Sequence, residues 1–168
     1  MKKATKAAIG VFVILIMVVI PLYHYTRPDS SQPFGTLQIK GSVNNPSNLT
    51  YLELTYYQSV TQKVTVSSSN HNIEDGNYTY TGVSLKEILT QAQVYSNAKS
   101  VYIQASDGYG ITLTIQEAEK DDVIIAYLKE GKTLTSLGDG GEGPFRLIIS
   151  SDEFAQRWVR GVISVSIS

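Results

Sequence analysis

The sequence predicts a small α+β domain that follows one N-terminal hydrophobic segment. The chain has 168 residues, 42% of them hydrophobic, which suits one domain with a buried core. Short runs of alternating apolar and polar residues indicate strands. Patterns of the form Ser/Thr-x-x-Glu at Ser84 and Thr114 are typical of helix starts. Because these strands and helices do not alternate strictly, they favour an α+β arrangement.

The first half of the body is expected to contain two strands and one helix. Residues 36–43 and 60–67 alternate in polarity and predict strands. Residues 48–57 fit a short helix and a strand equally well. A polar loop is expected over 68–77, and the capping pattern at Ser84 predicts a helix that reaches Gln93.

The second half of the body is expected to be rich in strands. Thr114 opens a single helical turn, and Glu130-Gly131 suits a hairpin turn. The predicted strands cover residues 101–105, 111–115, 123–128, 145–149 and 162–167.

The N-terminal segment predicts a membrane anchor. Residues 1–6 form a basic stub with three lysines, which should stay in the cytoplasm, and residues 7–25 form the transmembrane helix. Residues 26–35 are a linker, and 36–168 form a domain outside the cytoplasm. A cleaved signal peptide is the alternative, but the segment lacks the small-residue A-x-A pattern of a cleavage site. We therefore expect a single-pass protein of the cell membrane, with the membrane itself as one partner.

Composition excludes several classes of function. The net charge is -1, and four basic residues lie in the first 28, which leaves 10 basic against 14 acidic residues from Ser30 onward. This mildly acidic body argues against nucleic acid as a partner. The chain has no cysteine, which excludes disulfides, thiolate metal sites and lipid attachment at a cysteine. The body has one histidine, His71, so we expect no metal site built from several histidines.

A glycine-rich segment, residues 138–143, matches G-x-G-x-x-G literally. A dinucleotide site needs a strand before this motif and a helix after it, whereas Pro144 and a predicted strand follow here. The segment therefore predicts a flexible loop. Asp139 and Glu142 could hold a cation weakly, and the alternative is that both are simply solvated.

Six segments carry a resemblance through their order and spacing. They are 80–89, 105–118, 121–128, 130–134, 143–149 and 157–159. Together they resemble the molybdopterin-binding domain of sulfite-oxidase-type oxidoreductases, over about residues 36–168 and best after Thr79. The resemblance implies a mixed, strand-rich α+β fold and a site for a molybdopterin cofactor.

The departures from this family fall on its chemistry. In active members a cysteine thiolate at a strand end binds molybdenum, but the matching stretch here, 64–69, carries serine. A serine hydroxyl is a much poorer ligand than a thiolate. The family's histidine-glycine pair is missing from 140–143, and Ser150 replaces a proline. The resemblance therefore implies a retained fold whose usual redox site is lost.

A pocket kept by such a fold would be lined by five candidate residues. Arg146 could bind an anionic group bidentately, and a strand-end salt bridge is the alternative for it. The candidates for cofactor or ligand binding are Ser68, His71, Asp107, Tyr109 and Arg146.

Three functions remain open from the sequence. The first is a non-catalytic module that binds a small anionic or pterin-like ligand, or a membrane-associated protein partner, without a cofactor. The second is an active molybdopterin-dependent oxidoreductase with an atypical metal site. The third is a structural or adhesive surface domain, suggested by the 11 tyrosines and by possible glycosylation at Asn48 and Asn77.

Overall fold

The computed structural model describes the body of the chain almost completely. Its described residues are 12, 15–19, 35–66, 76–152 and 155–168. The chain divides into two compact units, Met1–Ser31 and Gln32–Ser168, and every described strand belongs to the second unit.

Most of the predicted anchor over 7–25 lies outside the described residues, as do residues 1–6 and 26–34. Phe12 and residues 15–19 are helical, and their side chains are exposed. Within the described part of the chain, no helix is both long enough and apolar enough to cross a membrane.

The first sheet has five strands in the order β2-β1-β10-β5-β6. β1 and β10 are parallel, and the other neighbours are antiparallel. Apolar and polar residues alternate in β1 because one face of the strand packs on the core. Leu37 and Ile39 lie on that face and are fully buried. The strands are β1 Thr36–Gly41, β2 Ser47–Thr50, β5 Ser100–Ala105, β6 Gly110–Thr114 and β10 Val162–Ile167.

The second sheet is built around β7, which pairs with β4 on one side and with both β8 and β9 on the other. Residues 123–127 of β7 are all buried, which explains why this strand reads as a continuous apolar run rather than an alternating one. β3 lies at the sheet edge beyond β4. The strands are β3 Ser59–Val66, β4 Gly76–Ser84, β7 Val123–Lys129, β8 Lys132–Thr133 and β9 Arg146–Ile149.

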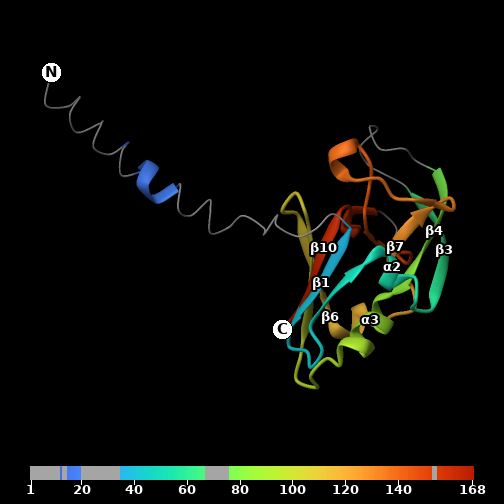
Figure 1. Cartoon of the computed structure of the whole chain (residues 1–168), viewed down its shortest axis with the longest axis horizontal. Helices are drawn as coiled ribbons and strands as arrows, with labels where there is room; N and C mark the ends of the chain where they lie inside the picture. The colour runs from blue at the N-terminus through green and yellow to red at the C-terminus, as the bar shows by residue number, and fades with distance from the viewer. Residues whose placement is uncertain (1–11, 13–14, 20–34, 67–75, 153–154) are drawn as a thin grey trace, which may run out of the picture. The chain divides into compact units, whose positions relative to one another are not determined.

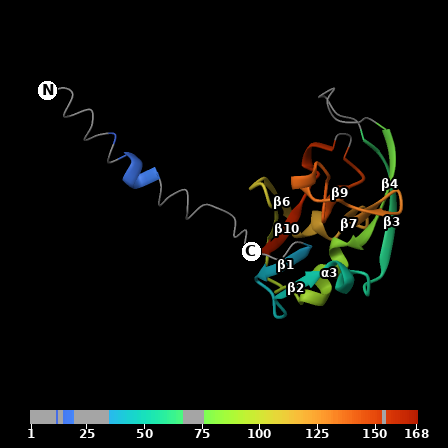
Figure 2. The same cartoon turned by 45° about the horizontal axis from the view of Figure 1, so that its top comes forward.

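Short helices complete the body. Figures 1 and 2 show the two sheets side by side with α3 between them at one end. One apolar core joins residues of both sheets to the buried face of α3. The helices are α2 Tyr51–Leu54, α3 Leu85–Ala92, α4 Ile115–Ala118, and the 3₁₀ turns η1 Leu137–Asp139 and η2 Ala155–Arg157.

Local sequence signals account for these helices. Ser84 caps α3 by accepting from the Glu87 amide, as its pattern predicts. Thr114 and Glu117 form the predicted capping box of α4. Thr50 and Glu53 form a further capping box, so the ambiguous segment 48–57 is a strand and a helix in succession.

The strand-rich α+β prediction is confirmed, with one large element missing from it. β4 is the longest described strand, whereas the sequence predicted a loop over 68–77 and no strand between that loop and the helix that Ser84 caps. β4 bonds to β3 and β7 at once, so it is central to the second sheet. β8 and the two 3₁₀ turns were also not predicted.

Candidate functional site

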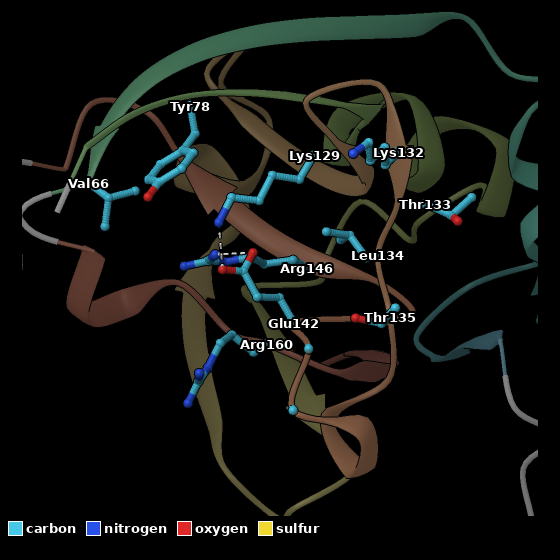
Figure 3. A pocket seen from close by; sticks show the side chains of 12 residues that line it. Val66, Tyr78, Lys129, Lys132, Thr133, Leu134, Thr135, Glu142, Arg146 and Arg160 are labelled. Carbon is cyan, nitrogen blue, oxygen red and sulfur yellow. Dashed lines mark hydrogen bonds and ion pairs between the residues drawn. The ribbon is translucent and has the colours of Figure 1, made fainter. Parts of the chain in front are cut away.

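A pocket of about 530 Å³ opens beside the second sheet. Its walls come from the ends of β3 and β4, the β7–β8 hairpin, the segment that leads into β9, and Arg160. Figure 3 shows the side chains that line it. They are Val66, Tyr78, Lys129, Lys132, Thr133, Leu134, Thr135, Gly140, Gly141, Glu142, Arg146 and Arg160.

Arg146 is the most deeply buried charge of the pocket. It begins β9 opposite Ala126 of β7, and only 5% of the residue is exposed. Its guanidinium carbon lies 5.2 Å from the ring centre of Tyr80 and 5.4 Å from that of Trp158. Aromatic faces attract cations at such distances, so both rings help to stabilise the buried guanidinium.

Glu142 neutralises Arg146 directly. Arg146 Nη1 lies 2.5 Å from Glu142 Oε2 and donates to the Tyr80 hydroxyl at 2.6 Å. That hydroxyl in turn donates to Glu142 Oε2 at 2.9 Å. The phenol therefore links the cation and the carboxylate in one charge-assisted network.

Lys129 supplies the second cation that contacts this carboxylate. Its ammonium donates to Glu142 Oε1 at 3.1 Å and lies 3.9 Å from the ring centre of Tyr78. Figure 3 shows the Lys129 and Arg146 groups converging on Glu142. Lys129 faces Tyr80 across the β4–β7 ladder, so the pairing of these strands brings it to the site.

A closely packed loop holds Glu142 in place. Gly143 donates its amide to Thr135 O at 2.6 Å, and Glu142 O accepts from the Gly161 amide at 2.8 Å. A Cβ atom on Gly143 would lie 2.6 Å from Leu134 O, and one on Gly141 would lie 2.1 Å from Thr135 Oγ1. Only glycine allows this approach, so the motif over 138–143 serves loop packing.

The rim of the pocket carries two further cations. Lys132 and Arg160 are both exposed, and Figure 3 shows them on opposite sides of the Glu142 cluster. Among the residues that the structure describes, neither makes an ion pair. The lining thus holds four cationic side chains and one carboxylate, a net charge of +3. This balance favours an anionic ligand.

The network shifts the pKa values of its acids in opposite directions. Burial alone would raise the pKa of Glu142, but the charge of Arg146 and the hydrogen bonds from Arg146, Lys129 and Tyr80 outweigh it. The pKa of Glu142 is therefore lowered from its ordinary value of 4.5. Burial raises the pKa of Tyr80 well above its usual range, against the opposing charge of Arg146, so its hydroxyl stays protonated.

Three of the five candidate residues from the sequence lie in the described part of the chain. Ser68 and His71 lie outside the described residues. Asp107 and Tyr109 lie together in the β5–β6 turn, where the Tyr109 amide donates to Asp107 Oδ1 at 2.9 Å. The Tyr109 hydroxyl donates to Gln156 O at 3.1 Å, and neither residue lines the pocket. A binding role for these four residues stays a prediction.

Arg146 is the candidate that the structure places in the pocket, and it also makes the salt bridge that was its alternative. Sequence reasoning missed Lys129, Arg160 and Tyr80, and considered Glu142 only as a weak cation ligand. The one sequence signal for this ion pair is the four-residue spacing of Glu142 and Arg146. That spacing predicts a contact only in a helix, whereas these residues lie in a loop and a strand.

Comparisons with known proteins agree on the family and the fold. A family model described as oxidoreductase molybdopterin binding domain matches residues 24–168. The crystal structure of the sulfane dehydrogenase SoxCD from Paracoccus pantotrophus matches with a TM-score of 0.67 and 23% identity. That match covers 79% of this chain but 37% of the other, so this chain spans well under half of its length, and the likeness shows the fold. A comparison with curated proteins gives no match.

The Glu142 network should make stability depend on pH. Because the folded pKa of Glu142 is depressed, its stabilisation is fully present above pH 4.5 and is lost as pH falls through the folded pKa. Glu142→Gln should therefore cost about 1.5–3 kcal/mol near neutral pH, the usual range for hydrogen bonds to charged groups. The difference from wild type should shrink in acid.

Urea unfolding of both proteins at about pH 7 and about pH 3 checks this. Glu119→Gln is the matched control, because Glu119 is exposed and forms no ion pair among the described residues. An equal difference at both pH values would show that Glu142 does not act as a charged partner.

Proposed function

The chain belongs to the oxidoreductase molybdopterin-binding domain family, and from this membership we propose that it is a non-catalytic member that binds a small anionic ligand. The observation that carries the proposal is the pocket, whose described lining has a net charge of +3. Membership of a molybdopterin-binding family supports a binding role for the domain, and the residues of the pocket determine what it accepts.

The residues present do not fit a molybdenum centre of the family type. The chain contains no cysteine at any position, so it supplies no thiolate to the metal. Pocket side chains offer amines, guanidiniums, hydroxyls and one carboxylate, and that carboxylate already accepts from three donors. Cationic groups of this kind suit an anion rather than a metal ion.

The dimensions and lining of the pocket indicate the class of ligand. A volume of about 530 Å³ holds a small molecule. Lys132 and Arg160 offer charge at the rim, the hydroxyls of Thr133 and Thr135 offer hydrogen bonds, and Leu134 adds an apolar surface. We therefore propose a ligand that carries phosphate, sulfate or carboxylate groups on a partly apolar frame.

We further propose that the domain is held at the outer face of the cell membrane. The support is the sequence of the N-terminus, where a basic stub precedes the apolar run over 7–25. A tether of this kind would restrict the domain to ligands or protein partners near the membrane surface.

Purified protein should contain no molybdenum. The full chain, produced in a host that makes the molybdenum cofactor, should show less than one metal per ten chains by elemental analysis, because no thiolate is available to bind it. Acid extraction and fluorescence test for a pterin in the same sample. One molybdenum per chain would contradict the proposal, whereas a pterin without molybdenum would identify the ligand of a non-catalytic module.

The rim cations should control anion binding. Inorganic pyrophosphate, titrated into the full chain in a neutral detergent, should bind saturably and more weakly at high salt. Arg160→Gln and Lys132→Gln should each weaken binding by up to about tenfold, equivalent to about 1.4 kcal/mol. Lys63→Gln serves as the control, since Lys63 is exposed on β3 and does not line the pocket. Absent binding, or equal loss in the control, would refute the assignment.

The tether predicts a defined fractionation. The full chain should remain with membranes after alkaline carbonate extraction, and removal of residues 7–25 should release it. Protease added from the outer side should digest the domain while the membrane is intact. Recovery of the full chain in the soluble fraction, or protection from external protease, would overturn the proposed location.

A further inference from the structure

We propose that the Glu142 carboxylate is an internal ligand, which fills the anion position on Arg146 and Lys129 and so determines which anions the pocket accepts. This inference rests on the proposed anion-binding function and deepens it. The floor of the pocket is formed by Arg146, Lys129 and Glu142, and its rim carries Lys132 and Arg160. While the Glu142 charge is in place, an incoming anion binds at the rim and not at the floor.

Glu142 is bound as a separate anion would be. Three donors from three strands converge on its carboxylate: Lys129 of β7 contacts Oε1, while the Tyr80 hydroxyl of β4 and Arg146 of β9 contact Oε2. Glu142 itself belongs to none of these strands, because it lies in the loop before β9. The strands thus form a cradle for an oxyanion, and the loop supplies the occupant.

The cradle has hydrogen-bonding capacity that Glu142 leaves unused. Arg146 Nη1 has two partners, but the buried Nε atom has no hydrogen-bond partner among the residues that the structure describes. An unpaired buried donor is costly, and a guanidinium prefers to bind an oxyanion through two of its nitrogens. One carboxylate shared among Arg146, Lys129 and Tyr80 does not provide this second contact.

Glu142 also determines where the pocket is attractive to an anion. With its charge in place, the floor of two cations and one carboxylate has a net charge of only +1, and the remaining +2 belongs to Lys132 and Arg160 at the rim. A compact anion that enters the floor would meet the Glu142 charge at close range. Removal of that charge would leave Arg146, Lys129 and the Tyr80 hydroxyl free to bind it.

A purely structural ion pair predicts a different result. Such a pair would stabilise the fold, and its loss would leave anion affinity unchanged or lower. Occupation of an anion site predicts the opposite direction, a gain of affinity when the carboxylate charge is removed. The Glu142 side chain is 23% exposed and lines the pocket, so an ion that enters the pocket can approach it.

The test uses inorganic phosphate and the full chain in a neutral detergent, with calorimetric titration of wild type and Glu142→Gln. We expect phosphate to bind the variant at least about tenfold more tightly than wild type. Lys129→Gln added to the variant should reverse most of this gain. Equal or weaker binding by Glu142→Gln would overturn the inference.

A matched control and a second readout protect the test against poor folding. Glu117→Gln removes a carboxylate that pairs with the exposed Arg157 outside the pocket, and it should give no gain. If Glu142→Gln folds poorly, phosphate should raise its thermal unfolding midpoint by more than it raises that of wild type. A phosphate-insensitive midpoint would overturn the inference as well.

The two proposals fail in distinguishable ways. Pyrophosphate binding that depends on Arg160 and Lys132, together with no gain in Glu142→Gln, would remove the inference and keep the proposed function. Phosphate binding by Glu142→Gln alone, with none by wild type, would keep the role of Glu142 and remove the proposed function.

Discussion

The burial of one guanidinium is the constraint on which the rest of the site depends. Arg146 lies at the start of β9, inside the second sheet, with 5% of its surface exposed. Such a charge persists only when it is paired, because loss of the partner leaves an uncompensated buried charge. Glu142 pairs with this charge, the Tyr80 hydroxyl accepts a hydrogen bond from it, and the rings of Tyr80 and Trp158 lie close to the guanidinium. The tightly packed glycine loop before β9 holds the carboxylate in position.

This arrangement separates the scaffold of the family from its chemistry. The chain matches the family model and builds its fold from two sheets and short helices, while it contains no cysteine with which to bind molybdenum. A cationic pocket remains where the strand ends of the second sheet meet. Its charges favour an anionic ligand, and we propose that Glu142 controls the binding of that ligand, because it pairs with the most deeply buried cation.

The sequence predicted what depends on neighbouring residues and missed what depends on strand pairing. The caps at Ser84 and Thr114 are hydrogen bonds between residues close in the sequence, and the apolar run of β7 reflects burial on both faces. The two helix starts and this strand could therefore be predicted from the sequence. β4 was missed because its Asn, Gly and Thr residues resemble a loop, and its role comes from β3 and β7. Lys129 and Tyr80 become neighbours only through that pairing. Asp107 and Tyr109 were also predicted as site residues; they do not line this pocket, and their role stays a prediction.

The ionisation of Glu142 tests the central claim most directly. Carbon-detected NMR can follow the Glu142 side-chain carboxyl through an acid titration of the full chain. A paired carboxylate that fills an anion site must titrate below the ordinary value of 4.5, and phosphate should leave that titration unchanged while Glu142 remains in place. A titration midpoint at or above 4.5 would show that the carboxylate does not neutralise Arg146, and it would contradict this account of the pocket.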